Sequence, residues 1–293
     1  MKKIILCTLM TLLIIALADC KKQEENKKGF ICALSIFPLY DIARNIAGEE
    51  AGVLFVIPAG ADPHTFEPLP SIAEKLQNAR LFIGVSKEFD GWIERYLPDN
   101  AARKYLMGGA DRGIRSSDPE YGAPNPHLWL SVKQGKIIAQ KIARFLAEAD
   151  PEGSGRYELN LFSYAKKLDA VDKTTARLFK STKNRSFIQW HEAWNYLADD
   201  YGLSIAGTVQ REGSDKASVR SIKEIVERAK KNRVTVIVVS LAAEARTARV
   251  LAREIRGTIA QLDGIGNPDE KERSDYLKLM LYNASRLAEA LRD

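Results

Sequence analysis

The sequence predicts an α/β protein with two lobes, each containing a mostly parallel four-stranded sheet with covering helices, joined by one long rigid helix. Three observations predict this fold. Short β-branched runs alternate with longer amphipathic stretches, which is typical of parallel sheets covered by helices. These runs form two sets of four, about 80 residues apart. The gap between the two sets contains one unusually long helical pattern.

The expected elements follow in chain order. The first set of strands is expected at 31–36, 53–57, 81–85 and 105–107, with helices at 38–47, 71–79 and 132–148. The second set is expected at 186–190, 203–209, 234–240 and 258–263, with helices at 192–200, 219–231 and 243–255. We therefore assign residues 30–150 to an N-terminal lobe and residues 183–293 to a C-terminal lobe.

The long helical pattern covers roughly residues 153–181. Its apolar stripe recurs every three or four positions and consists of Tyr157, Leu161, Tyr164, Leu168, Val171, Thr175 and Leu178. At ~1.5 Å per residue such a helix is about 42 Å long, which is more than one small domain needs. We expect residues 151–182 to connect the two lobes rigidly.

The start of the chain has the pattern of an export signal. Lys2 and Lys3 precede an apolar run that is short for a membrane span, so residues 1–19 are expected to be a signal peptide. The sequence LADC resembles a bacterial lipobox, in which Cys20 is lipidated, and the polar residues 20–29 would then form a tether. Ordinary cleavage after Ala18 is the alternative.

The composition fits a globular protein and argues against nucleic-acid binding. Of the 293 residues, 45% are apolar and 28% are charged. The net charge is +6, but basic residues are scattered among acidic ones, as in IKEIVERAKKNR, without interleaved aromatics. Cys7 leaves with the signal peptide and Cys20 would be acylated. Cys32 then has no disulfide partner, and we expect it to be a buried small side chain.

All three histidines lie at boundaries between elements. His64 follows the second expected strand, His127 precedes the last helix of the first lobe, and His191 follows the fifth strand. Asp263 ends the eighth strand. In open α/β sheets, ligands bind beyond the carboxyl ends of the strands, so a crevice between the lobes could bring these four residues together. An Asp at a strand end is also a common turn former, and water could take its place.

Three imidazoles and one carboxylate make a four-coordinate set. Imidazole suits zinc, and carboxylate suits harder ions such as manganese. The surrounding motifs resemble the zinc- and manganese-binding proteins of bacterial ABC importers, a cluster of solute receptors that includes many surface lipoproteins. The segments GADPHTFEP, NPHLWL and WHEAWNYLADDYGL resemble its three histidine motifs, and LDGIG lies where the family has its closing Asp. The resemblance extends over residues 31–293 and implies the ligands His64, His127, His191 and Asp263.

The resemblance also implies a function and its partners. The chain is expected to be a high-affinity receptor, periplasmic or at the cell surface, that hands a metal ion to a membrane permease driven by an ATPase. We expect zinc, because in this family a Glu in place of the third His accompanies manganese and here that position is His191. Manganese remains the alternative. We further expect a monomer that binds no nucleic acid.

The sequence departs from the family pattern beside the ligands. Trp190 and Glu192 replace the usual Ser and Asp around the third His, and Ser131 replaces an acidic residue after the second motif. Together with Glu67, Trp190 and Glu192 are candidates for orienting the imidazoles rather than binding the ion. Residues 108–126 contain no His, so no auxiliary His-rich loop is expected.

Two other functions fit part of the pattern. A zinc hydrolase would need a second His where HEAWN has Asn195, and it would need an open coordination position for water. Four protein ligands would close that position, so we do not expect an enzyme. A surface adhesin or structural lipoprotein is compatible with the lipid anchor, but it has no need for converging ligands.

Overall fold

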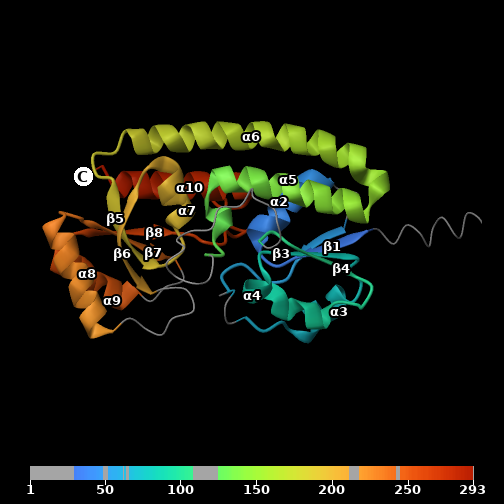
Figure 1. The fold of residues 1–293 in the computed structure, drawn as a ribbon, viewed down its shortest axis with the longest axis horizontal. Coiled ribbons are helices and arrows are strands. Elements are labelled where there is room, and N and C mark those ends of the chain that lie inside the picture. The colour runs from blue at the N-terminus through green and yellow to red at the C-terminus, as the bar shows by residue number, and fades with distance from the viewer. Residues whose placement is uncertain are drawn as a thin grey trace, which may run out of the picture.

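The computed structural model describes residues 30–48, 52–61, 63, 66–107, 125–210, 218–241 and 245–292. The expected signal peptide and tether therefore lie outside the described residues. Within them, the chain forms two four-stranded sheets with strand orders β2-β1-β3-β4 and β6-β5-β7-β8, and every strand pair is parallel. The predicted fold class is confirmed (Figure 1). No helix among these residues is long and apolar enough to cross a membrane.

The first sheet contains β1 (Ile31–Leu34), β2 (Gly52–Phe55), β3 (Leu81–Gly84) and β4 (Ala102–Tyr105). The expected position of β4, 105–107, was wrong by three residues. The strand contains Arg103 and Lys104 and lies at the sheet edge, so it lacks the apolar run of a central strand. The apolar residues Leu106 and Met107 follow it and still donate N–H bonds to β3 and Val85.

Helices cover both faces of this sheet. Figure 1 shows α2 (Phe37–Ala47) and α5 (Val132–Ala149) on the side toward α6, and α3 (Pro70–Leu76) and α4 (Lys87–Asp90) on the opposite side. A 3-10 helix at Gly91–Tyr96 continues α4. The first strand also buries Cys32 completely, as expected for a small apolar side chain, and burial raises the pKa of its thiol.

The connecting helix is α6 (Ser154–Lys180), which runs for 27 residues or about 40 Å. Its buried residues are Tyr157, Tyr164, Leu168, Val171, Thr175 and Phe179, which confirms the helix predicted from the apolar stripe. It contacts α2 and α5 of the first lobe and α10 (Tyr276–Ala290) of the second. One continuous helix therefore lies along both lobes (Figure 1).

The second sheet contains β5 (Ser186–His191), β6 (Ser204–Gln210), β7 (Val236–Ser240) and β8 (Thr258–Leu262). Helices α8 (Val219–Lys231) and α9 (Ala245–Ile255) cover one face, with a separate apolar cluster beneath them. Helices α7 (Asn195–Tyr201) and α10 lie on the face toward α6 (Figure 1).

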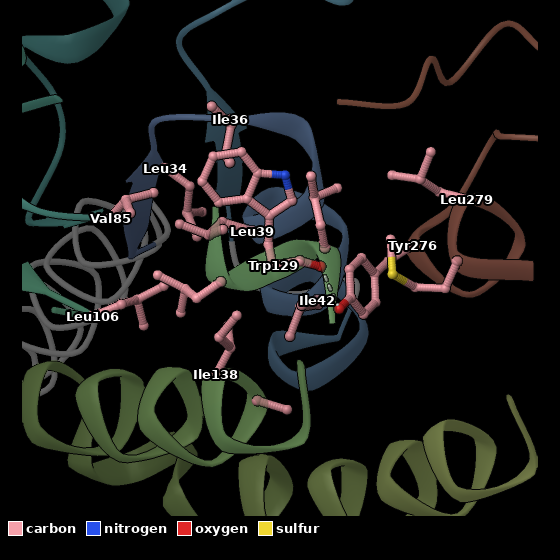
Figure 2. Close-up of a cluster of buried hydrophobic side chains, with 14 of the residues drawn as sticks. Leu34, Ile36, Leu39, Ile42, Val85, Leu106, Trp129, Ile138, Tyr276 and Leu279 are labelled. Carbon is pink, nitrogen blue, oxygen red and sulfur yellow. Dashed lines mark hydrogen bonds between the residues drawn. The ribbon is translucent and has the colours of Figure 1, made fainter. Parts of the chain in front are cut away.

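A packed contact also joins the lobes away from α6. Tyr276, the first residue of α10, is fully buried beside the core of the first lobe, and its hydroxyl donates to the Trp129 carbonyl at 2.8 Å (Figure 2). The Asp41 carboxylate on α2 accepts the Tyr276 backbone N–H at 2.9 Å. On α5, Gly135 leaves room for this ring, because a Cβ there would lie 2.3 Å from the Tyr276 hydroxyl oxygen.

Candidate metal centre

His127 is held in one orientation by its own turn. It lies just before a 3-10 helix, Leu128–Leu130, and is 5% exposed. The Asn125 side-chain oxygen lies 2.9 Å from both the His127 backbone N–H and Nδ1. An amide oxygen can only accept, so Nδ1 must carry the proton of the neutral ring. The lone pair is then on Nε2, the atom that faces the second lobe.

His191 meets His127 from the other lobe. It is the last residue of β5, at the carboxyl edge of the second sheet. The two Nε2 atoms lie 3.2 Å apart, and the ring planes are inclined at 84°. Two nitrogens bound at ~2.0–2.1 Å to one tetrahedral zinc ion are separated by about 3.4 Å. The observed separation therefore fits two ligands of one ion.

The lobes are joined by polar contacts around this histidine pair. Asn125 Nδ2 donates to the Glu192 carbonyl at 2.8 Å, and the Tyr196 hydroxyl donates to the Asn125 carbonyl at 2.8 Å. The Ser131 hydroxyl caps α5 by accepting the Gln134 N–H and also donates to the Asp200 carboxylate. An acidic group is therefore present next to Ser131, but it comes from the second lobe.

Aromatic side chains surround His127. The rings of Trp129 and Phe89 lie 5.2 Å and 6.4 Å from the imidazole, centre to centre. Trp129 is 1% exposed and lies within the main core, as expected for a packing residue. Its indole N–H donates to the Gly264 carbonyl at 2.7 Å, which ties the loop after β8 to the His127 segment.

Asp263 orders that loop. Its carboxylate accepts the N–H groups of Ile265 and Gly266 at 2.9 Å each and forms an ion pair with Arg273 at 2.7 Å. Its backbone N–H and carbonyl both bond to the Asn283 side chain. Both carboxylate oxygens thus have protein partners. The ligand role of Asp263 stays a prediction.

His64 lies outside the described residues. Among the described residues, no group of three His, Cys, Asp or Glu side chains is arranged to hold a metal ion. Of the candidate orienting residues, Glu67 is exposed and Trp190 packs beside the cluster under α8 and α9. Glu192 contributes its backbone carbonyl, which accepts the Asn125 amide.

Sequence reasoning missed the role of Asn125, although this residue is part of the quoted motif NPHLWL. The available signal was an amide two residues before a ligand histidine, at a spacing that allows a local side-chain bond. It could not show that the same amide also bonds to the second lobe.

The fold and the paired imidazoles define a two-lobed α/β binding protein with a candidate metal site between its lobes. Residues 33–290 match the family described as ZnuA, zinc-uptake complex component A, periplasmic, and the chain belongs to this family.

Individual relatives agree with the family match. The metal ABC transporter substrate-binding lipoprotein ScbA of Streptococcus cristatus is 29% identical, over 99% of each chain. The zinc-binding lipoprotein AdcA of Streptococcus pneumoniae is 28% identical over 98% of this chain but only 60% of its own length. A Mn-bound mutant of the periplasmic metal-binding protein of Candidatus Liberibacter asiaticus shares the fold. Its TM-score is 0.81 at 21% identity, covering 89% of this chain and 99% of that one.

Proposed function

We propose that this protein is an extracytoplasmic receptor that binds a divalent transition metal between its lobes and delivers it to the permease and ATPase of an ABC importer. The observation that carries the proposal is the 3.2 Å approach of two Nε2 atoms from different lobes. Family membership and the names of the relatives support the transport role.

The proposed ligands are His64, His127, His191 and Asp263, and the proposed metal is zinc, with manganese second. Nitrogen donors favour zinc, and the general affinity order places zinc above manganese. Four protein ligands leave no coordination position for a reactive water, so we propose carriage of the ion and no catalysis. We also propose a monomer that is anchored through lipidated Cys20, which mass spectrometry of the mature N-terminus would test.

Calorimetric titration of the metal-stripped protein tests the proposal. Zinc should bind tightly, and Ala in place of His64, His127 or His191 should weaken its binding strongly. The buried Cys32, replaced by Ala, serves as the control and should leave zinc affinity unchanged. Tight manganese binding with negligible zinc uptake would overturn the choice of metal. Unchanged zinc affinity in the three histidine variants would overturn the site.

A further inference from the structure

The positive charge of the chain is concentrated on α8, α9 and the residues that directly follow them. Residues 219–233 and 245–256 contain ten Lys and Arg against three Glu, a net charge of +7. The rest of the chain contains 34 basic and 35 acidic residues, so it is close to neutral. The ten residues, which we call the basic face, are Arg220, Lys223, Arg228, Lys230, Lys231, Arg233, Arg246, Arg249, Arg253 and Arg256.

The fold places these charges on one side of the molecule. Helices α8 and α9 contact each other and form a single layer over the second sheet, at the end of the molecule shown at the left of Figure 1. Their apolar sides, including Ile225 and Leu251, are buried against the sheet. All ten basic side chains are consequently exposed. Only three Glu residues lie among these ten basic residues, so the layer is strongly positive although the sequence looks mixed.

Little of this charge is neutralised within the described part of the chain. Arg220 pairs with Glu224 at 3.0 Å and Lys230 approaches Glu254 at 3.5 Å, and all four side chains are more than half exposed. Such exposed ion pairs contribute little to stability. Arg246, Arg249 and Arg253 on α9 form no ion pair with another described residue. Their spacing of three and four residues places them on one side of that helix.

We propose that the basic face docks on an anionic phospholipid membrane. Lys and Arg near such a surface are attracted by its negative potential, and guanidinium groups bind phosphate through paired hydrogen bonds. Successive arginines among the seven on this face are three or more positions apart in the sequence, which spreads them over a surface rather than into a pocket. Val250, which is 55% exposed beside Arg249, adds an apolar side chain at the same surface.

The expected lipid anchor favours a membrane as the partner. The ten residues 20–29 can span at most about 35 Å, so an anchored fold stays close to the bilayer. The strand that follows these residues in the chain, β1, belongs to the first lobe, whereas the basic face belongs to the second lobe (Figure 1). Docking of the basic face would add a second point of attachment, and tethering raises its effective concentration at the membrane. Two points of attachment would limit how the anchored receptor can turn.

Vesicle co-sedimentation of the mature chain carrying Cys20→Ser tests this inference without a lipid anchor. The probes are vesicles of phosphatidylcholine alone and vesicles in which one lipid in three is phosphatidylglycerol. We expect binding to the anionic vesicles only, and a loss of at least about tenfold in partitioning between about 0.05 M and 0.5 M salt, where screening becomes strong. Equal binding to both vesicles, or binding to neither at low salt, would overturn the proposal.

A pair of charge-matched variants locates the surface. Arg246→Glu/Arg249→Glu/Arg253→Glu should reduce partitioning onto anionic vesicles by at least about tenfold. The control Lys167→Glu/Lys173→Glu/Arg177→Glu makes the same change in net charge on α6 and should retain most of the binding. Equal losses in both variants would show a general charge effect and refute the assignment to α8 and α9. Circular dichroism confirms that each variant is folded, and Gln replaces Glu in both variants if the α9 variant is not.

Discussion

At the scale of single residues, the candidate site depends on a side chain that is not expected to touch the ion. Asn125 fixes the proton of His127 on Nδ1, orients its Nε2 toward His191, and bonds to the carbonyl of Glu192. An imidazole that is free to rotate or to change tautomer would lose the alignment of its lone pair with the ion. Outer hydrogen bonds of this kind commonly change metal affinity by about 10–100-fold.

We therefore expect Asn125→Ala to weaken zinc binding by about 10–100-fold, with the stoichiometry unchanged. Competition with a chromophoric chelator measures this loss. The matched control is Asn160→Ala on α6, which removes an amide that also bonds to a backbone carbonyl, that of Ile46, but lies far along the chain from both histidines. The role assigned to Asn125 is wrong if both variants bind zinc as tightly as the unmodified protein.

A second prediction at this scale concerns Asp90, which is fully buried in the first lobe. Burial raises its pKa to about 7, against the opposing effect of the N–H bonds from Val85 and Ser86. The folded protein thus binds a proton at Asp90 more tightly than the unfolded chain does. The stabilising contribution of this proton is complete below about pH 4 and is lost as the pH rises through 7.

Asp90→Asn removes this titration. Urea unfolding of the metal-free proteins should show that the stability of the unmodified protein, relative to the variant, falls between pH 4 and pH 7. The fall should be on the order of a few kcal/mol. A difference that is constant over this range would show that the two states bind the Asp90 proton equally.

At the scale of elements, the closest approach between two described helices at a glycine is that of Gly135 on α5 to Tyr276 on α10. Gly135→Ala should destabilise the protein by about 1–3 kcal/mol, because the new methyl group meets the rigid, buried Tyr276 ring. Gly155→Ala in α6 is the control, since nothing lies within 4 Å of its added Cβ, and it should stabilise by up to about 1 kcal/mol. Denaturant midpoints compare the two, and equal effects would contradict the packing argument.

Several elements with a clear period were predicted from the sequence, whereas α10, whose buried residues also recur every three or four positions, was not among the expected helices. The stripe that includes Tyr164 and Leu168 predicted α6, and continuous apolar runs predicted the central strands. The edge strand β4 was misplaced because its half-exposed residues lack that signal. The meeting of His127 and His191 followed from their places at strand and helix ends. The bond from Asn125 to Glu192 could not be predicted, because it depends on how two separately folded lobes face each other.

At the scale of the whole molecule, a metal ion held by residues from both lobes should stabilise them together. Zinc at a thousandfold excess over its Kd should add about 4 kcal/mol, which corresponds to a rise of about 10 °C in Tm. Scanning calorimetry with and without zinc measures this rise. The variant His127→Ala serves as the control and should show little of it. An unchanged Tm in the unmodified protein would favour a structural surface protein over a receptor.

Acid should reverse this stabilisation. Histidines must be neutral to bind metal, and the unperturbed imidazole pKa is about 6.5. Zinc retention should therefore fall steeply between pH 7.5 and pH 5.5, as measured by elemental analysis after dialysis. Retention that stays flat over this interval would exclude a site based on imidazoles.

The continuity of α6 should limit the motions by which a bound metal ion is released. This helix has no glycine or proline after Gly155. The hydrogen bond from the Tyr276 backbone N–H to the Asp41 carboxylate also joins the two lobes. A large rotation of one lobe relative to the other would break this contact. Unloading should therefore proceed through small local shifts of the strand-end loops, such as the one that Asp263 and Arg273 hold in place. Little of the binding free energy should then be spent on closing the lobes around the ion.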